Sequence, residues 1–401
     1  MFQFIDNGTV TSVNGFKAAG IHCGIKKRKK DLALIYSDAP CDAAGTFTLN
    51  KVQAAPILIS KKIIENKNKV HCVLINSGNA NACTGELGHN DAIITQEFLA
   101  VKLGLKPEEV LVSSTGVIGQ PLPMEVMLKG VNKISGMLSD DGGLDAAEAI
   151  MTTDLRIKSY ALKVKLNSGE ITIGGICKGS GMIMPNMATM LAFLTTDAGI
   201  DQPVLQELLL TSVNKSFNKI TVDGDTSTND MVILMANGVS GININKCTED
   251  YKLFSEALTA ISEEMAKSIV VDGEGATKLI AVSVNNARTL NDADIIAKSI
   301  ANSPLVKTAF NGGDANWGRI ISAAGKSGAD FNPLKAEIYF NDLPIMMSNY
   351  KIVIDEDKAA EILNLDKFSV SLHLNDGNYS TTWWTCDFSQ EYIKINANYR
   401  T

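Results

Sequence analysis

Thr189 is the residue whose position in the sequence best suits a catalytic nucleophile. It follows the glycine-containing segment KGSGMIMPNMA, residues 178–188, and precedes the apolar run LAFLTTDA. Glycines allow a close backbone approach, Pro185 stiffens the segment, and the small Ala188 leaves space at the carbonyl before the threonine hydroxyl. A threonine that opens a strand after a tight loop is the arrangement that an N-terminal nucleophile requires.

Such a threonine would attack the carbonyl of the residue before it. An N→O acyl shift and hydrolysis of the ester would then free the α-amino group of the threonine. An α-amine titrates at about pH 8, so it serves as the adjacent base without a histidine. The residue types leave this interpretation open, because any glycine-rich turn before a strand has the same pattern.

The other motifs of catalysis and cofactor binding are incomplete. The histidines are His22, His71, His89 and His373, and no pair has the spacing of a zinc site. The chain has no G-x-S-x-G elbow for a Ser-His-Asp triad. Gly325-Lys326-Ser327 resembles the end of a phosphate loop, but Ile320 occupies the position of the required glycine. A dinucleotide fingerprint starting at Gly179 fails at Met184. We therefore expect no metal, and we expect His71, within an apolar strand, to be a core residue.

A second candidate element is the segment SSTGVIG, residues 113–119, directly after the strand-like run EVLV. The backbone N–H of Gly116 and a donor from Thr115 suit an oxyanion hole. An ordinary turn at the end of a strand explains the same residues equally well.

Runs of β-branched and aliphatic residues alternate with segments of helical spacing. The pattern predicts strands from Asp31, Val70 and Glu109, and helices from Asp91, Gln202, Glu249 and Asp292. It also predicts hairpins from Leu162 and Leu334, with Ser-Gly and Asn-Asp turns. This mixture indicates an α/β or α+β fold with considerable sheet.

The amino-acid composition indicates which kinds of binding partner and which cellular compartment to expect. The chain has 401 residues and a formal net charge of −7, which argues against nucleic acid as a partner. The seven cysteines are scattered, without a C-x-x-C pair, and are expected to be free thiols in a reducing compartment. We see no signal peptide and no membrane span, so we expect a soluble, cytoplasmic protein. The basic run KKRKK, residues 26–30, is expected to be a solvated loop.

Several long motifs occur in order along the whole chain. They are GTFT (45–48), AAP (54–56), NSGNANACTG (76–85), SSTG (113–116), MTTD (151–154), residues 178–191, TVDGDTSTND (221–230), DGEGATK (272–278) and INANYRT (395–401). On these motifs the chain resembles the ornithine acetyltransferase family of arginine biosynthesis. That family is also called bifunctional glutamate N-acetyltransferase / amino-acid acetyltransferase.

The resemblance implies roles for particular residues. Thr189 would be both the cleavage point, after Ala188, and the nucleophile. Thr115 and Gly116 would form the oxyanion hole. The substrate contacts would be Thr152, Lys178, Thr189, Glu274, Asn396 and Thr401. Lys178 suits a substrate carboxylate, and Glu274 suits a cationic amine or would help to position the attacking amine. Asp223 and Asp225 are expected to fix a loop near the site rather than to bind metal.

The resemblance also implies a fold and a reaction. The fold would be stacked β-sheets between helical layers, similar to self-processing aminopeptidases of the N-terminal-nucleophile type. Residues 1–188 would form an α subunit and residues 189–401 a β subunit, assembled as α2β2. An acetyl group would pass from N-acetylornithine through Thr189 to glutamate without a metal or organic cofactor. Some members also use acetyl-CoA as the donor.

The sequence departs from the expected family pattern at three places: Met184, the run NGGD at 311–314, and the run WWTCD at 383–387. None of them removes a catalytic residue type. Two alternatives stay open beside the transferase: a self-cleaving aminopeptidase or amidase that passes the acyl group to water, and an unprocessed, non-catalytic binding protein.

Overall fold

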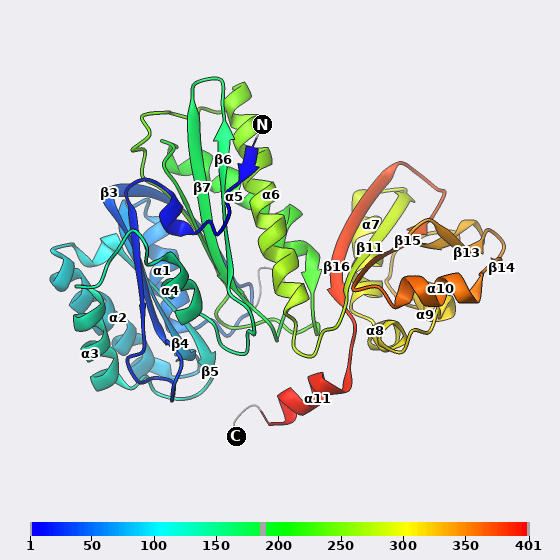
Figure 1. Ribbon diagram of the computed structural model, residues 1–401, viewed down its shortest axis with the longest axis horizontal. Helices are drawn as coiled ribbons and strands as arrows, with labels where there is room; N and C mark the ends of the chain where they lie inside the picture. Colours follow the sequence, from blue (N-terminus) through cyan, green and yellow to red (C-terminus); the bar gives the residue numbers. More distant parts are fainter. Residues whose placement is uncertain (1, 185–189, 399–401) are drawn as a thin grey trace. The chain divides into compact units, whose positions relative to one another are not determined.

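The computed structural model describes residues 2–184 and 190–398, which form two compact units (Figure 1). Unit 1 comprises residues 2–179, 190–218 and 225–269, and unit 2 comprises residues 180–184, 219–224 and 270–398. Each unit is therefore built from segments that are distant in the sequence.

Unit 1 is built on a nine-stranded mixed sheet with the order β1-β6-β7-β8-β10-β3-β4-β5, and β2 also pairs with β3. The strands are β1 (Phe2–Phe4), β2 (Phe16–Ile21), β3 (Leu32–Phe47), β4 (Val70–Asn79), β5 (Val110–Val117), β6 (Lys158–Lys165), β7 (Glu170–Lys178), β8 (Leu191–Thr196) and β10 (Met231–Ala236). The residues of β8 and β10 are all buried, as expected for central strands whose sequences are mostly or wholly apolar.

Helices cover this sheet. They are α1 (Ala55–Glu65), α2 (Gly85–Leu103), α3 (Met124–Ile134), α4 (Gly143–Ala149), α5 (Gln202–Lys215) and α6 (Glu249–Val271), with short 3₁₀ turns at Val10–Ser12 and Pro107–Glu109. The helices α1 and α2 pack on β5, α4 packs on β2, and α2 lies beside α3 (Figure 1). Gly104 ends α2 in the left-handed conformation, at the glycine where the sequence pattern closes this helix.

Unit 2 is built on a seven-stranded sheet with the order β14-β13-β12-β15-β11-β16-β9. The strands are β9 (Ile220–Thr221), β11 (Leu279–Ala287), β12 (Glu337–Phe340), β13 (Leu343–Met347), β14 (Lys351–Ile352), β15 (Lys367–His373) and β16 (Tyr379–Cys386). The helices are α7 (Leu290–Ala301), α8 (Pro304–Asn311), α9 (Trp317–Gly325), α10 (Glu356–Leu363) and α11 (Gln390–Ala397), with a 3₁₀ turn at Pro333–Lys335. A further 3₁₀ turn, Phe217–Lys219, contains the point where the chain passes from unit 1 to unit 2.

The predicted α/β class, with sheets and helices in layers, is confirmed. The strands predicted from Asp31, Val70 and Glu109 are β3, β4 and β5, and the predicted hairpins are β6–β7 and β12–β13. The four predicted helices are α2, α5, α6 and α7. Within the described ranges, no helix combines the length and apolar character needed to cross a membrane.

The predicted cleavage position falls between two neighbouring strands of the unit 1 sheet. Strand β7 precedes it and β8 follows it, and these strands pair antiparallel, with Lys178 opposite Leu191. On its other edge β8 pairs with β10, which in turn pairs with β3. The segments on either side of residue 188 are thus interleaved in one sheet.

Candidate functional site

The predicted site residues fall into two groups, one in each unit. Thr115, Gly116, Thr152 and Lys178 belong to unit 1, whereas Glu274 and Asn396 belong to unit 2. The predicted cleavage pair Ala188–Thr189 and the terminal Thr401 lie outside the described residues.

Asp154 organises the polar cluster of unit 1. It is fully buried, and its Oδ1 accepts hydrogen bonds from Lys158 Nζ at 2.8 Å and from Gly179 N at 2.7 Å. Its Oδ2 accepts from the Thr152 N–H at 2.9 Å and lies 3.9 Å from Lys178 Nζ. Burial alone would raise the pKa of Asp154, but the charges of Lys178 and Lys158 outweigh it and hold that pKa well below its usual range. One ionised carboxylate therefore links two of the predicted substrate contacts.

The predicted oxyanion residues stand at the end of β5, next to this cluster. Lys178 Nζ lies 3.5 Å from Thr115 Oγ1. Gly116 has φ = 133°, and a Cβ atom there would come within 2.4 Å of the Gly78 carbonyl carbon. Only glycine fits this close approach of β4 and β5. The structure thus brings Thr115, Lys178 and Thr152 together through Asp154.

Asn229 braces the strand that carries Thr115. Its Nδ2 donates to the carbonyl oxygens of Ala80 at 2.6 Å and Ser114 at 2.9 Å. The Ser114 hydroxyl also donates to Asn76 Oδ1 at 2.5 Å. No role for Asn229 was predicted from the sequence. The available signal was a run of small polar residues immediately before the buried strand β10.

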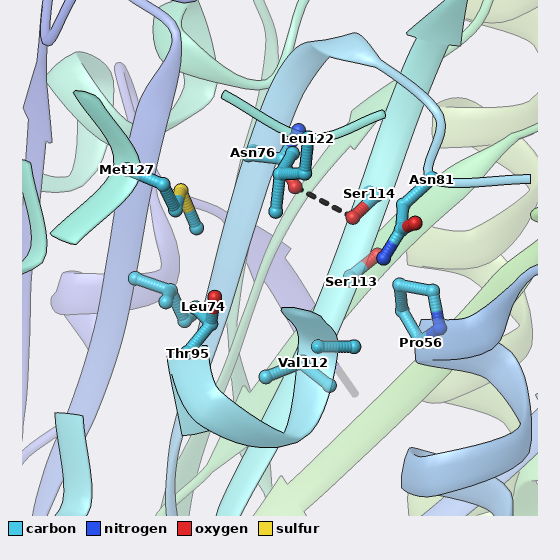
Figure 2. A pocket seen from close by; sticks show the side chains of 11 residues that line it. Pro56, Leu74, Asn76, Asn81, Thr95, Val112, Ser113, Ser114, Leu122 and Met127 are labelled. Atoms are coloured by element: carbon cyan, nitrogen blue, oxygen red, sulfur yellow. Dashed lines mark hydrogen bonds between the residues drawn. The ribbon is translucent and has the colours of Figure 1, made fainter. Parts of the chain in front are cut away.

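Residues of the same strand, β5, among them Ser113 and Ser114, line a small cavity of about 10 Å³ (Figure 2). Its lining combines apolar side chains with polar ones, among them Asn76, Asn81, Thr95, Ser113 and Ser114. Space of this size holds about one water molecule. The cavity is therefore too small for a substrate. Ser113, which lines it, is 3% exposed, and its hydroxyl has no partner in the part of the chain that the structure describes.

Lys26 departs from the expectation of a fully solvated basic loop. Its Nζ donates to the carbonyl oxygens of Met151, at 2.5 Å, and of Lys30, at 2.9 Å. Burial lowers the pKa of Lys26 to about 8, against the opposing charge of Asp31. The first residue of the run is thus part of the fold beside Thr152, whereas residues 27–29 are exposed.

Glu274 and Asn396 are in direct contact within unit 2. Asn396 Nδ2, on α11, donates to Glu274 Oε2 at 2.8 Å, and Glu274 is 6% exposed. The Glu274 N–H donates to the Ser180 carbonyl at 3.0 Å. A Cβ at Gly181 would lie 2.3 Å from the Glu274 carboxyl carbon, so the glycine permits this contact. The structure brings these two predicted substrate contacts together.

Asp223 fixes the segment that precedes the predicted cleavage site, as the sequence analysis expected. Its carboxylate accepts from the backbone N–H groups of Met182, at 2.6 Å, and Ile183, at 2.8 Å. Tyr392 Oη donates to the same carboxylate at 3.3 Å. Across the described residues, no group of three or more His, Cys, Asp or Glu side chains has the arrangement of a metal site.

His71 and the seven cysteines are further side chains that could take part in catalysis or bind a metal. His71 on β4 is half-buried rather than in the core, where it was predicted, and its Nδ1 lies 3.0 Å from the Ser37 carbonyl oxygen. All seven cysteines lie in the described ranges and are free thiols, as predicted.

Comparison with known proteins gives one consistent family. Residues 17–401 match the ArgJ family. The chain is 47% identical over 398 residues to the arginine biosynthesis bifunctional protein ArgJ of Symbiobacterium thermophilum, covering 98% of this chain and 99% of that protein. It is also 47% identical over 405 residues to the arginine biosynthesis bifunctional protein ArgJ 1 of Clostridium acetobutylicum, covering 100% and 99%.

Two solved structures are also similar in sequence. The crystal structure of ArgJ from Bacillus halodurans is 40% identical, with a TM-score of 0.44, covering 46% of this chain and 97% of that chain. The ornithine acetyltransferase from Mycobacterium tuberculosis complexed with ornithine is 37% identical, with a TM-score of 0.43, covering 46% and 99%. The full-length sequence matches are decisive: this chain belongs to the ArgJ family.

Proposed function

We propose that the protein transfers the acetyl group of N2-acetyl-L-ornithine to L-glutamate in arginine biosynthesis, through an acetyl ester of Thr189. The observation that carries the proposal is the buried cluster in which Asp154 links Lys178 to Thr152, with Thr115 beside Lys178. Membership of the ArgJ family supports it, because relatives are named for arginine biosynthesis and one for ornithine acetyl transfer.

The nucleophile would be made by the chain itself. The Thr189 hydroxyl attacks the Ala188 carbonyl, the peptide becomes an ester, and water hydrolyses it. The products are an α subunit, residues 1–188, and a β subunit, residues 189–401, which assemble as α2β2. The interleaved strands β7 and β8 support fragments that stay folded together.

In the first half-reaction, the Thr189 Oγ bonds to the acetyl carbon while the α-amine of Thr189 takes the hydroxyl proton. Thr115 and the Gly116 N–H stabilise the oxyanion, a contribution of about 10²–10³ in rate for one donor. The C–N bond then breaks, and the ammonium returns its proton to the leaving amino group of ornithine.

In the second half-reaction, the amino group of glutamate attacks the acetyl ester, and Thr189 regains its proton. The name "bifunctional" of the relatives supports acetyl-CoA as an alternative acetyl donor. This chemistry requires neither a metal nor an organic cofactor, and we propose a cytoplasmic location.

The binding roles follow from charge and from hydrogen bonding. Lys178 holds a substrate carboxylate, and Thr152 lies on the same Asp154 brace. Glu274, held by Asn396, binds the side-chain ammonium group of ornithine. The terminal residue Thr401 adds a further contact. These assignments rest on the motifs of the family together with the local geometry within each unit.

A partition experiment tests the reaction. The protein is incubated with N-acetylornithine carrying a labelled acetyl group, with and without glutamate. We expect N-acetylglutamate in proportion to the N-acetylornithine consumed. Release of the label mainly as acetate would instead indicate an amidase, and no turnover would indicate a binding protein.

A further inference from the structure

Asp387 is a buried acid to which the proposed reaction gives no role. It directly follows β16 and is 1% exposed. Its Oδ1 accepts hydrogen bonds from the backbone N–H groups of Thr277, at 2.8 Å, and Lys278, at 3.0 Å. Its Oδ2 accepts from the Thr277 hydroxyl at 2.6 Å and from Asn311 Nδ2 at 2.6 Å. Most of these donors belong to the loop 272–278, which also carries Glu274.

The strand register explains why Asp387 meets this loop. Strands β11 and β16 pair antiparallel, with Leu279 opposite Cys386. The loop 272–278 ends directly before Leu279, and Asp387 directly follows Cys386. The two segments therefore leave the same end of the strand pair side by side. The side chain of Asp387 continues their contact beyond the last pair of the ladder.

Helix α8 holds Asp387 from another direction. Asn311, which donates to Asp387, is the last residue of α8, and the fully buried Lys307 lies about one turn before it. Lys307 Nζ donates to the Cys386 carbonyl, and the Lys307 carbonyl accepts from the Phe388 N–H at 3.1 Å. The backbone on both sides of Asp387 is thus fixed to the same helix.

The chain that follows Asp387 reaches Glu274 by a second route. Ser389 caps α11, and its hydroxyl donates to the Gly275 carbonyl at 2.6 Å. Asn396 on the same helix donates to Glu274 Oε2 at 2.8 Å. Asp387 therefore binds the backbone of the loop and also precedes the helix that contacts the Glu274 carboxylate. A shift of Asp387 would displace Glu274 through both connections.

Two departures from the expected family pattern meet at this contact. Asn311 begins the run NGGD at 311–314, and Asp387 ends the run WWTCD at 383–387. Neither run contains a predicted substrate contact. The hydrogen bond between Asn311 and Asp387 joins them, and the bonds from Asp387 to Thr277 connect both runs to the Glu274 loop.

We propose that Asp387, held by Asn311, is a positioning residue that fixes the Glu274 carboxylate and thereby sets the preference for an acyl donor with a cationic side chain. The inference rests on the proposed binding of the ornithine ammonium group by Glu274. Asp387 is buried and acts through the loop 272–278 rather than on the substrate. A carboxylate already held in place binds an ammonium group more strongly than a mobile one, because less ordering accompanies binding.

The test compares two acyl donors that differ only at the end of the side chain. N2-acetylornithine ends in an ammonium group, and N2-acetylnorleucine has a methyl group in its place. The ratio of their kcat/KM values measures the preference for the cation, and it is independent of the amount of folded enzyme in a preparation. Where N2-acetylnorleucine turns over too slowly to measure, its inhibition constant is compared with the KM of N2-acetylornithine.

Asp387→Ala should lower this ratio about tenfold, because it removes the hydrogen bonds that hold the Glu274 loop. The loss should fall on N2-acetylornithine and leave N2-acetylnorleucine unchanged. An equal loss for both donors would indicate a merely structural role and would overturn the proposal, as would an unchanged ratio.

Asp387→Asn separates hydrogen bonding from charge. An asparagine keeps one oxygen for the N–H groups of Thr277 and Lys278, and its amide nitrogen can donate to the Thr277 hydroxyl and to a turned Asn311 amide. We therefore expect a ratio within about threefold of the wild type. A ratio as low as that of Asp387→Ala would assign to Asp387 a direct charge effect on the substrate and would overturn the positioning role.

Asn311→Ala leaves the core intact, because Asn311 is exposed. We expect the ratio to fall about threefold, through loss of one hydrogen bond to Asp387. Thr308→Ala provides the comparison: Thr308 is also exposed on α8, but its hydroxyl donates to the Pro304 carbonyl of the same helix at 2.8 Å. This variant should keep the wild-type ratio. A wild-type ratio in Asn311→Ala, or an equal change in both variants, would contradict the role of Asn311.

Glu274→Gln distinguishes this inference from the proposed function. It should lower the same ratio at least as far as Asp387→Ala, because it removes the charge that faces the ammonium group. A lowered ratio in Glu274→Gln together with an unchanged ratio in Asp387→Ala would overturn the role of Asp387 alone. An unchanged ratio in Glu274→Gln would refute the proposed binding role of Glu274, and the role of Asp387 would fall with it.

Discussion

Asp154 shows how one residue sets the electrostatics of unit 1. It is fully buried and shared by Lys158, Thr152 and Gly179, with Lys178 at 3.9 Å. Burying this carboxylate costs less free energy than burying an isolated one, because the positive charges of two ammonium groups compensate its negative charge. The residue therefore serves folding and the position of Lys178 at the same time.

Asp154→Asn should destabilise the protein by about 3 kcal/mol at pH 7, because it leaves Lys158 and Lys178 buried without their counter-charge. The folded-state pKa of Asp154 is depressed, so its contribution to stability is complete above the unfolded pKa of about 4, declines as the pH falls below that value, and is fully lost only below the folded-state pKa. Urea unfolding at pH 7 and pH 3 measures this. A difference between wild type and variant that does not shrink at pH 3 would contradict the assignment.

Gly116→Ala should lower the rate of acetyl transfer about 10²-fold, because the added Cβ would meet the Gly78 backbone and displace the oxyanion N–H. Gly119→Ala is the matched control: Gly119 also has a positive φ, but a Cβ there meets nothing within 4 Å. Steady-state kinetics of both variants decides the point. Equal losses would indicate backbone strain rather than an oxyanion role.

At the scale of elements, the sequence predicted the parts whose pattern is local. Strands β3 to β5 and helix α2 have apolar periodicity and end at turn residues, and both hairpins have polar turns. The sequence pattern did not predict the helices α1, α3, α4, α8, α9, α10 and α11, of which α4 and α11 show why. The first is short and rich in alanine and glycine, and the second has no buried residue in its apolar pattern. Tertiary contacts stabilise such elements, and a local pattern does not report them.

The residues of the candidate site also fall into those that could be predicted from the sequence and those that could not. Thr115, Lys178 and Glu274 could be named because long motifs resemble a known family. The partners that hold them, Asp154 and Asn229, lay within quoted motifs without an assigned role. Their function depends on hydrogen bonds between segments far apart in sequence, such as Asn229 to Ser114. A single sequence contains no direct signal for such a bond.

Asn229→Ala tests whether the position of the end of β5, which carries Thr115 and Gly116, affects catalysis. Loss of its amide leaves the carbonyl groups of Ala80 and Ser114 without this donor and loosens the end of β5. We expect kcat to fall at least tenfold with a smaller change in KM, because the oxyanion contribution operates in the transition state. Unchanged kcat with a raised KM would assign Asn229 to substrate binding instead.

At the scale of the whole molecule, the sheet of unit 1 contains strands from both sides of residue 188. Strand β8 is paired along its length with β7 on one edge and β10 on the other. We expect the two cleavage products to co-elute in native size-exclusion chromatography and to separate only in denaturant. Separation of the fragments under native conditions would contradict this arrangement of strands in the cut protein.

Denaturing mass spectrometry of the purified active protein tests directly whether the chain cleaves itself between Ala188 and Thr189. We expect two fragments, of 188 and 213 residues (401 − 188 = 213), with Thr189 as the first residue of the second. We also expect Thr189→Ala to remain one chain of 401 residues without transferase activity. A fully active preparation that contains only the intact chain would contradict the proposal, as would a Thr189→Ala variant that still transfers acetyl groups.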